Sequence, residues 1–291
     1  MCKKGTVIYL LLFIYSGIAA QSGDKLIPAP GINFKWPAVE KRISTSVLKH
    51  FVNQQPDEFT AYRDTARYME NIDSLYKQLH AVDINNDGLD DIIFEGKYTG
   101  EGSLVQIFMN TGKLYKKVFE DRQGITKMEW DNRVLSTLWI EDWGCCADYV
   151  EFKKKYSIQF QPAGASVFTQ VYQAAEMFDG TKPDSLFADA FAFEVLNSDY
   201  KLRAQPVIDD TSMFPWQEGD TLRATGNYIG KLTEGSIGTA LGKKTDITGR
   251  EWWYVEIDEK YPLQKSAFYD NENKFPTKTR GWLSSRFLRR L

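Results

Sequence analysis

Short apolar segments with period-two alternation, separated by turn residues, constrain the fold of this 291-residue chain more than any other feature. The segments are rich in β-branched and aromatic residues, and clusters of Asn, Asp and Gly separate several of them. This spacing is typical of strands joined by tight turns in an antiparallel meander. The expected strands occupy residues 81–84, 92–94, 104–109, 115–119, 125–130, 134–140, 149–160 and 167–174.

Two segments before this series have the periodicity of amphipathic helices. In residues 38–54, apolar side chains recur at intervals of about three or four residues. Residues 58–78 are expected to form a second helix, with a similar apolar stripe that runs from Tyr62 to Leu79. The expected fold class of the first part is therefore α+β, with N-terminal helices followed by an antiparallel meander.

The connection between the first two expected strands has the composition of a cation-binding loop. Asp83, Asn85 and Asp87 place a side-chain oxygen at every second position, and Asp91 adds a carboxylate four residues after Asp87. Calcium takes about six to eight oxygen ligands, and a short loop of this kind presents several of them. We therefore expect these four residues to bind Ca²⁺ together with the backbone carbonyl of Leu89.

The residues after this loop distinguish it from an EF-hand. An EF-hand requires Glu at loop position 12, where this chain has Phe94, and the apolar residues around Phe94 predict a strand. Residues 80–110 instead resemble the calcium loop of the FG-GAP/VCBS repeat family, in a single copy. In that family the ion rigidifies a connection between strands, so the resemblance implies a structural ion. A solvated Asp/Asn/Gly turn without metal is the alternative.

The C-terminal third of the chain contains three segments of a different type. They are Leu-Arg-Ala-Gln-Pro at 202–206, Trp-Trp-Tyr-Val-Glu-Ile at 252–257 and Gly-Trp-Leu-Ser-Ser-Arg-Phe-Leu at 281–288. Together they resemble the bacterial SH3 domain family over residues 190–291, which implies a small SH3-like β-barrel. Long inserts between these segments depart from the family pattern and put its binding loops in doubt. The expected core consists of Leu202, Val255, Ile257, Trp282 and Leu283.

Alternation within the segment 252–257 suggests a ligand site on this barrel. Successive side chains of a strand point to opposite faces, so Trp252, Tyr254 and Glu256 share the face opposite the apolar one. Aromatic-lined grooves suit extended peptides, and these three residues are therefore the expected ligand groove. Packing of Trp252 and Tyr254 against other parts of the protein is the alternative.

The N-terminus has the layout of a secretory signal peptide. Lys3 and Lys4 precede an apolar run at 7–15, which is too short to span a bilayer, and small residues lead to an expected cleavage between Ala20 and Gln21. No later segment has the roughly 20 apolar residues that a membrane span needs. We expect an exported protein, periplasmic or extracellular, with no transmembrane anchor after cleavage; a retained anchor is the alternative.

These features predict the organisation of the chain and exclude one class of partner. The net charge of −3 offers no electrostatic basis for binding nucleic acid. The expected parts are a signal peptide at 1–20, an α+β domain with the calcium-type loop at 21–185, and an SH3-like β-barrel at 186–291.

Cys145 and Cys146 are the cysteines that remain after signal cleavage, and they are adjacent. Free thiols are unusual in an oxidising compartment. One prediction is therefore a disulfide bond between these two neighbouring cysteines. Two buried reduced cysteines are the alternative.

No established catalytic motif occurs in the sequence, which lacks Gly-x-Ser-x-Gly, His-Glu-x-x-His and a Gly-rich phosphate loop. We therefore expect no catalytic residues. The expected function is that of a non-catalytic binding or scaffold protein of the cell envelope, whose partner is a cell-wall peptide or an envelope protein. An envelope hydrolase with its catalytic centre in the first domain is the alternative.

Overall fold

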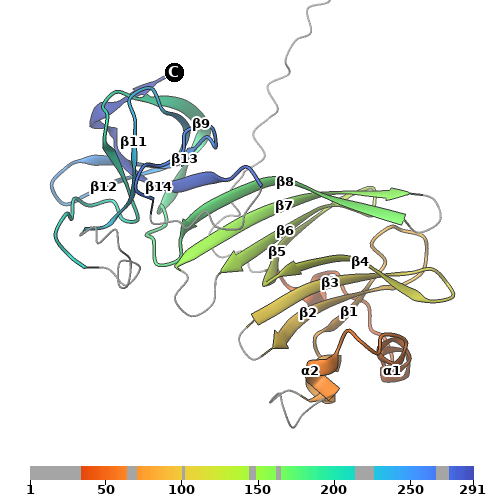
Figure 1. Cartoon of the computed structure of the whole chain (residues 1–291). Helices are drawn as coiled ribbons and strands as arrows, with labels where there is room; N and C mark the ends of the chain where they lie inside the picture. Colours follow the sequence, from red (N-terminus) through yellow and green to blue (C-terminus); the bar gives the residue numbers. More distant parts are fainter. Residues whose placement is uncertain are drawn as a thin grey trace, which may run out of the picture.

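The fold is mostly β, as Figure 1 shows for a computed structural model of the chain. The structure describes residues 34–63, 71–99, 102–143, 149–161, 165–213, 226–266 and 275–291. The expected signal peptide and both cysteines lie outside these residues, so the predictions about them stay predictions. None of the helices in the described ranges is long and apolar enough to cross a membrane.

The first four strands form an antiparallel sheet in the order β1-β2-β3-β4. Gly112, with a φ of 77°, turns the chain between β3 and β4 in a conformation that favours glycine. The predicted strands are confirmed here, with β2, β3 and β4 longer than expected, but the first strand is shifted: β1 ends at Val82 and not at residue 84. The strands are β1 (Leu79–Val82), β2 (Asp91–Thr99), β3 (Gly102–Asn110) and β4 (Tyr115–Arg122).

The α-helices before β1 cover one face of this sheet, whereas the 3-10 helix before them packs through Trp36 on the other face. The elements are the 3-10 helix η1 (Trp36–Ala38), α1 (Thr45–Gln54), α2 (Thr60–Arg63) and α3 (Ile72–Tyr76). The expected continuous helix at 58–78 is wrong, because the extended backbone of Asn71 interrupts it. The Asn71 side chain accepts hydrogen bonds from the backbone N–H groups of Asp73 and Ser74, which caps a new helix.

The next four strands continue the meander and cover the other face of the first sheet. Asn132 and Arg133 both have positive φ, as a two-residue hairpin turn between β5 and β6 requires. The strands are β5 (Gly124–Asp131), β6 (Val134–Trp143), β7 (Val150–Gln161) and β8 (Ala165–Met177).

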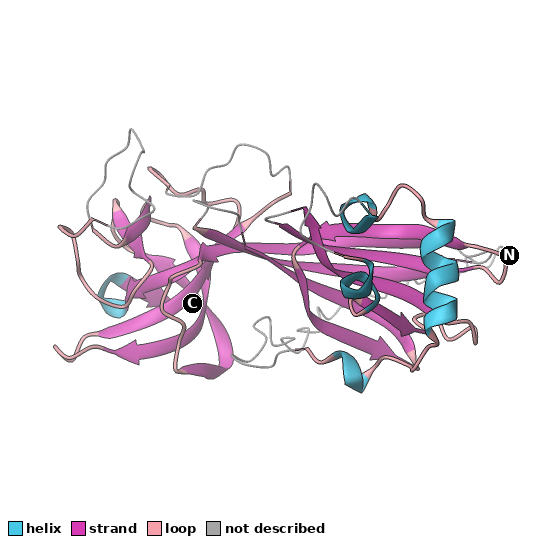
Figure 2. Cartoon of the chain, turned by 90° about the horizontal axis from the view of Figure 1, so that it is seen from below, coloured by secondary structure: helices cyan, strands magenta, loops and turns pink. Residues whose placement is uncertain are grey.

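Burial on both faces explains the three layers of this part of the molecule. Ile92 and Phe94 of β2 pack toward the helices, whereas Ile93 between them packs toward β5–β8. Neighbouring side chains of a strand point to opposite faces, so a continuous apolar run marks a sheet that is covered on both sides. The helices that precede the first sheet lie at one end of the molecule and the C-terminal strands at the other (Figure 2).

The C-terminal strands form a curled, open sheet. Its order is β15-β9-β12-β13-β14, and β14 also pairs with β10, which pairs with β11. In the described residues no pairing joins β11 to β15, so the expected β-barrel is not closed. The elements are β9 (Ser185–Val195), β10 (Tyr200–Arg203), β11 (Tyr228–Leu232), β12 (Ile237–Thr245), β13 (Glu251–Ile257), β14 (Lys278–Ser284), η4 (Ser285–Phe287) and β15 (Leu288–Arg290).

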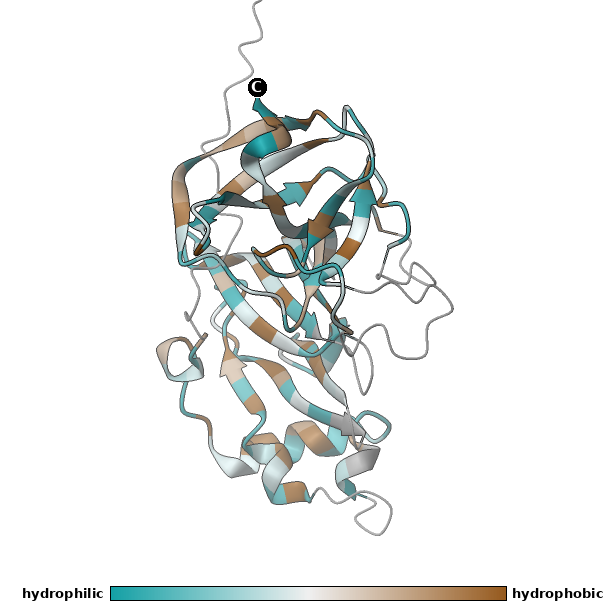
Figure 3. Ribbon diagram, turned by 90° about the vertical axis from the view of Figure 1, so that its left-hand side faces the viewer, coloured by the Kyte–Doolittle hydropathy of each residue, from teal (hydrophilic) through white to brown (hydrophobic). Residues whose placement is uncertain are grey.

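Four of the five expected core residues share one apolar cluster, whereas Trp282 packs with Trp252 and Tyr254 on the opposite face. All five predicted residues are buried, and Trp282 is fully inaccessible with its indole N–H donating to the Thr181 carbonyl at 2.7 Å. Apolar and polar positions alternate along the strands (Figure 3), as the sequence pattern predicts.

A parallel pairing joins the C-terminal strands to the meander. Lys278 and Thr279 of β14 pair with Ala174 and Ala175 at the end of β8. Because of this contact, β5–β8 and the C-terminal strands belong to one eleven-stranded sheet. The sheet therefore continues across the boundary expected at residue 185.

Candidate functional site

The prediction of an open ligand groove on β13 is wrong, because its three residues are buried. Trp252, Tyr254 and Glu256 have only 1%, 4% and 2% of their surface exposed. The end of β8 covers this face, because β14 pairs with β8 and brings it alongside β13. The alternative expectation, in which Trp252 and Tyr254 pack against other parts of the protein, describes the structure.

Charged and hydroxyl groups fill the region between β8 and β13–β14 instead of a ligand. Tyr254 donates its hydroxyl hydrogen to Glu176, and the Arg280 Nε donates to Glu256 at 2.9 Å. Tyr172 of β8 bonds to both Glu256 and Arg280. These side chains bond to one another in the interior, so this polar cluster has a structural role.

A neighbouring acidic triad offers the geometry of a metal site. Carboxylate oxygens of Glu141, Glu151 and Glu176 lie within 4.8 Å of one another. However, Lys153 lies 2.7 Å from Glu151, and Lys182 lies 2.5 Å from Glu176. Two ammonium groups therefore already compensate the carboxylates, and the triad is better explained as a buried ion network.

The structure brings the predicted calcium residues into one tight loop between β1 and β2. Asp83 accepts hydrogen bonds at 3.1 Å from the backbone N–H groups of Asp87 and Gly88. Asp87 in turn accepts from the Leu89 N–H at 2.8 Å. A φ of 87° at Gly88 permits the sharp turn. Hydrogen bonds from backbone N–H groups to the carboxylates of the same loop thus stabilise its tight conformation.

Asp91 anchors this loop from inside the protein. Its carboxylate is fully buried and accepts from the backbone N–H groups of Ile84 at 3.1 Å and Asn110 at 2.8 Å. Burial raises the pKa of Asp91 to about 7, and the nearby charges of Asp87 and Asp83 add to this effect. Such a concentration of carboxylates fits a hard cation that takes oxygen ligands.

A surface pocket of about 210 Å³ opens next to the predicted groove. Exposed apolar side chains form part of its wall, with Ile208 at 51% and Phe287 at 45% exposure. Of the three predicted groove residues, only Trp252 reaches this pocket. Sequence analysis missed the remaining lining residues because they lie in the insert after Pro206 and on several separate strands and turns.

Positive charge exceeds negative charge around this pocket, which we call the Arg250 pocket. Lys201 and Arg203 share the carboxylate of Asp210, at 3.0 Å and 2.8 Å. Arg250 has no carboxylate partner among the described residues, and its guanidinium lies 5.9 Å from the centre of the Trp252 ring. The pocket therefore presents a free guanidinium beside apolar surface.

Tyr200 provides a fixed wall of the same pocket. Its hydroxyl donates to the Ser284 carbonyl at 2.6 Å. Burial raises the pKa of Tyr200, whereas the nearby charges of Arg250, Arg203 and Arg286 offset part of this effect. The hydroxyl consequently stays protonated at neutral pH and lies in a positive field.

The histidines serve local structure in the described residues. His80 bonds to Glu40 at 2.7 Å and stacks on Trp36 with ring centres 3.7 Å apart, and burial lowers the pKa of His80. His50 bonds to Gln54. Neither histidine is hydrogen-bonded to a hydroxyl or thiol within the described ranges, so these contacts give no support to a nucleophile–base pair.

Comparisons with known proteins return no relative: neither a family model, nor a curated protein, nor a solved structure matches this chain. The resemblances to the bacterial SH3 and FG-GAP/VCBS families therefore rest on the residues of the chain alone.

Proposed function

We propose that this chain is an exported, non-catalytic binding protein of the cell envelope, whose C-terminal SH3-like part captures a peptide that carries a carboxylate. The observation that carries this proposal is the guanidinium of Arg250, which lacks a carboxylate partner among the described residues and borders an apolar pocket. Guanidinium groups bind carboxylates in a planar, two-bond geometry.

The size and lining of the Arg250 pocket favour part of a peptide over a larger compact ligand. Its volume of about 210 Å³ is below the roughly 300–1,000 Å³ of typical small-molecule sites. One or two residues of a peptide fit such a volume, with an apolar group against Ile208 and Phe287 and a carboxylate toward Arg250. Cell-wall peptides, or peptide segments of an envelope protein, have this chemistry.

Burial of the predicted core supports the SH3-like assignment of the C-terminal strands. The open edge between β11 and β15 departs from a closed barrel, but neither edge strand lines the Arg250 pocket, whose residues come from β10, the insert after Pro206, the turn before β13, β13, β14 and η4. The pocket thus combines residues of the resembling strands, such as Arg203, Trp252 and Ser284, with Ile208 and Asp210 of the insert after Pro206.

We also propose a structural Ca²⁺ in the loop of Asp83, Asn85, Asp87, Leu89 and Asp91. Four side chains with oxygen donors and one backbone carbonyl suit this ion. Asp91 lies in the interior at the start of β2, between β1 and the end of β3, so an ion held there would stiffen the first sheet. It would not take part in binding at the Arg250 pocket, which lies on other strands.

Export follows from the signal-peptide layout and places the protein where wall peptides are accessible. A direct test is co-sedimentation of the mature chain, residues 21–291, with purified peptidoglycan. The wild type should sediment, and Arg250→Gln should be retained about tenfold less, because it loses a charge-assisted contact. Arg133→Gln in the β5–β6 turn is the matched control and should sediment as the wild type does. Wall-peptide binding through this pocket would be contradicted if the wild type and both variants sedimented equally, or if none of them sedimented.

The same experiment separates binding from hydrolysis. A binding protein leaves the wall intact, whereas a hydrolase releases soluble fragments with time. Steady release of fragments by the wild type would favour the alternative of an envelope hydrolase.

A further inference from the structure

A bulge in β9 creates a second pocket on the C-terminal sheet. Ala240 of β12 pairs with Phe191 and Gly242 pairs with Leu186, so residues 187–190 of β9 lie opposite Leu241 alone. Such an insertion bends a strand and re-aims its side chains. A pocket of about 340 Å³ lies against this bulge.

Three aromatic rings define this second pocket, which we call the Phe191 pocket. The ring centres of Phe187 and Phe191 are 5.0 Å apart at an angle of 55°. Phe191 and Trp253 are also 5.0 Å apart, and their planes are perpendicular. Rings at such angles present faces in different directions, and an aromatic face attracts a cation through its quadrupole.

The chain places one of its own cations on this aromatic surface. The guanidinium of Arg290 lies 4.1 Å from the centre of the Phe191 ring. Arg290 is exposed and has no carboxylate partner in the described part of the chain, unlike its neighbour Arg289, which pairs with Glu194. The contact with the ring therefore holds Arg290 without competition from an ion pair.

The rim of the Phe191 pocket adds a carboxylate that is free to bind. Asp189, in the bulge, is exposed and forms no ion pair with any described residue. Glu251 is already engaged, since it accepts from the Trp253 indole N–H at 2.8 Å and lies 3.7 Å from Lys243. A flat aromatic face beside one available carboxylate suits a guanidinium, which both stacks and forms paired hydrogen bonds.

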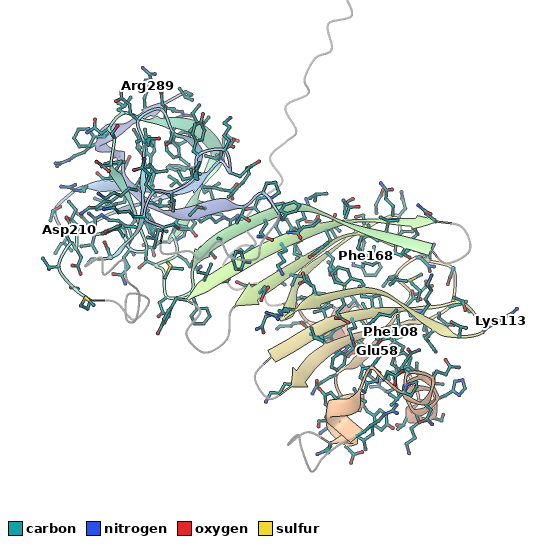
Figure 4. All side chains as sticks on the ribbon, viewed as in Figure 1. Glu58, Phe108, Lys113, Phe168, Asp210 and Arg289 are labelled. Carbon is teal, nitrogen blue, oxygen red and sulfur yellow. The ribbon has the colours of Figure 1, made fainter. Side chains whose placement is uncertain are left out.

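We propose that the Phe191 pocket binds an arginine side chain of a protein partner, which takes the place of Arg290 on Phe191 and pairs with Asp189. This site is independent of the proposed function at the Arg250 pocket, because the two pockets share no lining residue. Asp210, which lines the Arg250 pocket, and Arg289, the neighbour of Arg290 in the Phe191 pocket, lie on different sides of the C-terminal strands (Figure 4).

Arg290 competes with the partner in this arrangement. Its removal should therefore strengthen binding of an external arginine, whereas loss of the Asp189 charge should weaken it. A purely structural role for Arg290 would produce neither effect, and this contrast makes the proposal testable with exposed substitutions that leave the core intact.

The experiment is an NMR titration of the ¹⁵N-labelled mature chain with a blocked Gly-Arg-Gly peptide. The Trp253 indole signal, assigned with Trp253→Phe, is the local probe, and a Gly-citrulline-Gly peptide is the neutral control of nearly equal shape. The arginine peptide should shift the Trp253 signal and the citrulline peptide should not. Arg290→Gln should bind the arginine peptide about fivefold more tightly than the wild type.

Two further variants complete this test. Asp189→Asn in the Arg290→Gln background should weaken binding, and Arg289→Gln should leave it unchanged. Failure of Arg290→Gln to bind, with its thermal unfolding unchanged, would overturn the proposal. Equal shifts with both peptides would also overturn it. Concentration-dependent shifts without peptide would instead assign the pocket to a second copy of this chain.

Discussion

Arg280 and Glu256 form an ion pair of 2.9 Å in the protein interior, where their side chains are 0% and 2% exposed. Arg280 comes from β14 and Glu256 from β13, and Tyr172 of β8 bonds to both. The pair therefore lies where the C-terminal strands meet the meander. Its groups hold that junction together and explain why no open groove runs along β13.

Removal of the positive partner should destabilise the protein strongly. Arg280→Met leaves the Glu256 carboxylate buried without its main counter-charge, which should lower the free energy of unfolding by about 3–5 kcal/mol. Urea denaturation provides the measurement. Arg289→Met is the matched control, because the Arg289–Glu194 pair is exposed and should contribute about 1 kcal/mol or less. Similar losses in both variants would contradict a structural role for the buried pair.

The ion network around Glu176 predicts acid sensitivity. Burial alone would raise the pKa of Glu176, yet the charges of Lys182, Lys153 and Arg280 lower it to about 2. An unfolded Glu has a pKa of about 4.3, so the stability from this carboxylate is complete above that pH and is lost as the pH falls toward about 2.

Denaturation of the wild type and Glu176→Gln across this pH range tests the assignment. The wild type should lose stability more steeply between about pH 5 and pH 2 than the variant, since only the wild type takes up a proton at this position. If the stability of both proteins changed with pH in the same way, Glu176 would not be the source of the predicted acid sensitivity.

Calcium should stabilise the mature protein through the β1–β2 loop. An ion that binds only the folded state adds about 2.7 kcal/mol at a free concentration of 100 Kd. Thermal melts with calcium and with chelator should therefore separate for the wild type and coincide for Asp87→Ala. Asp131→Ala, in a different turn, should retain the calcium effect. Coincident wild-type melts, with no metal found by elemental analysis, would rule out the site.

Trp282 should be among the most costly side chains to remove. It is fully buried, and its loss leaves both a cavity and an unpaired Thr181 carbonyl. Trp282→Ala should cost about 3–5 kcal/mol, measured by urea denaturation. Trp130→Ala serves for comparison, because Trp130 is 36% exposed and should cost clearly less. Unchanged stability of Trp282→Ala would remove the basis for this core.

Local sequence patterns predicted the meander well, because each strand and turn is specified by neighbouring residues. Continuous apolar runs such as Ile92-Ile93-Phe94 marked β2, and Asn132 lies in the expected turn between β5 and β6. The five core residues of the C-terminal part followed from alternation and from the family resemblance, and all are buried.

Long-range contacts account for what the sequence did not reveal. The burial of Trp252, Tyr254 and Glu256 depends on pairing between Lys278 and Ala174, which no local pattern signals. The helix break at Asn71 depends on a capping contact that overrides a continuous apolar stripe. The Arg250 pocket likewise assembles residues that are far apart in the chain, so only the structure could show it.

The most direct test of the proposed function compares one peptide with a free C-terminal carboxylate and the same peptide as its amide. Calorimetric titration should show that the wild type binds the carboxylate form at least about tenfold more tightly, because a hydrogen bond to a charged group contributes about 1.5–3 kcal/mol. A soluble wall peptide with an apolar residue next to its terminus is the probe. Arg250→Gln should lose this preference while unfolding at the wild-type temperature. Equal affinity of the wild type for both forms would contradict carboxylate recognition by Arg250, and with it the central claim.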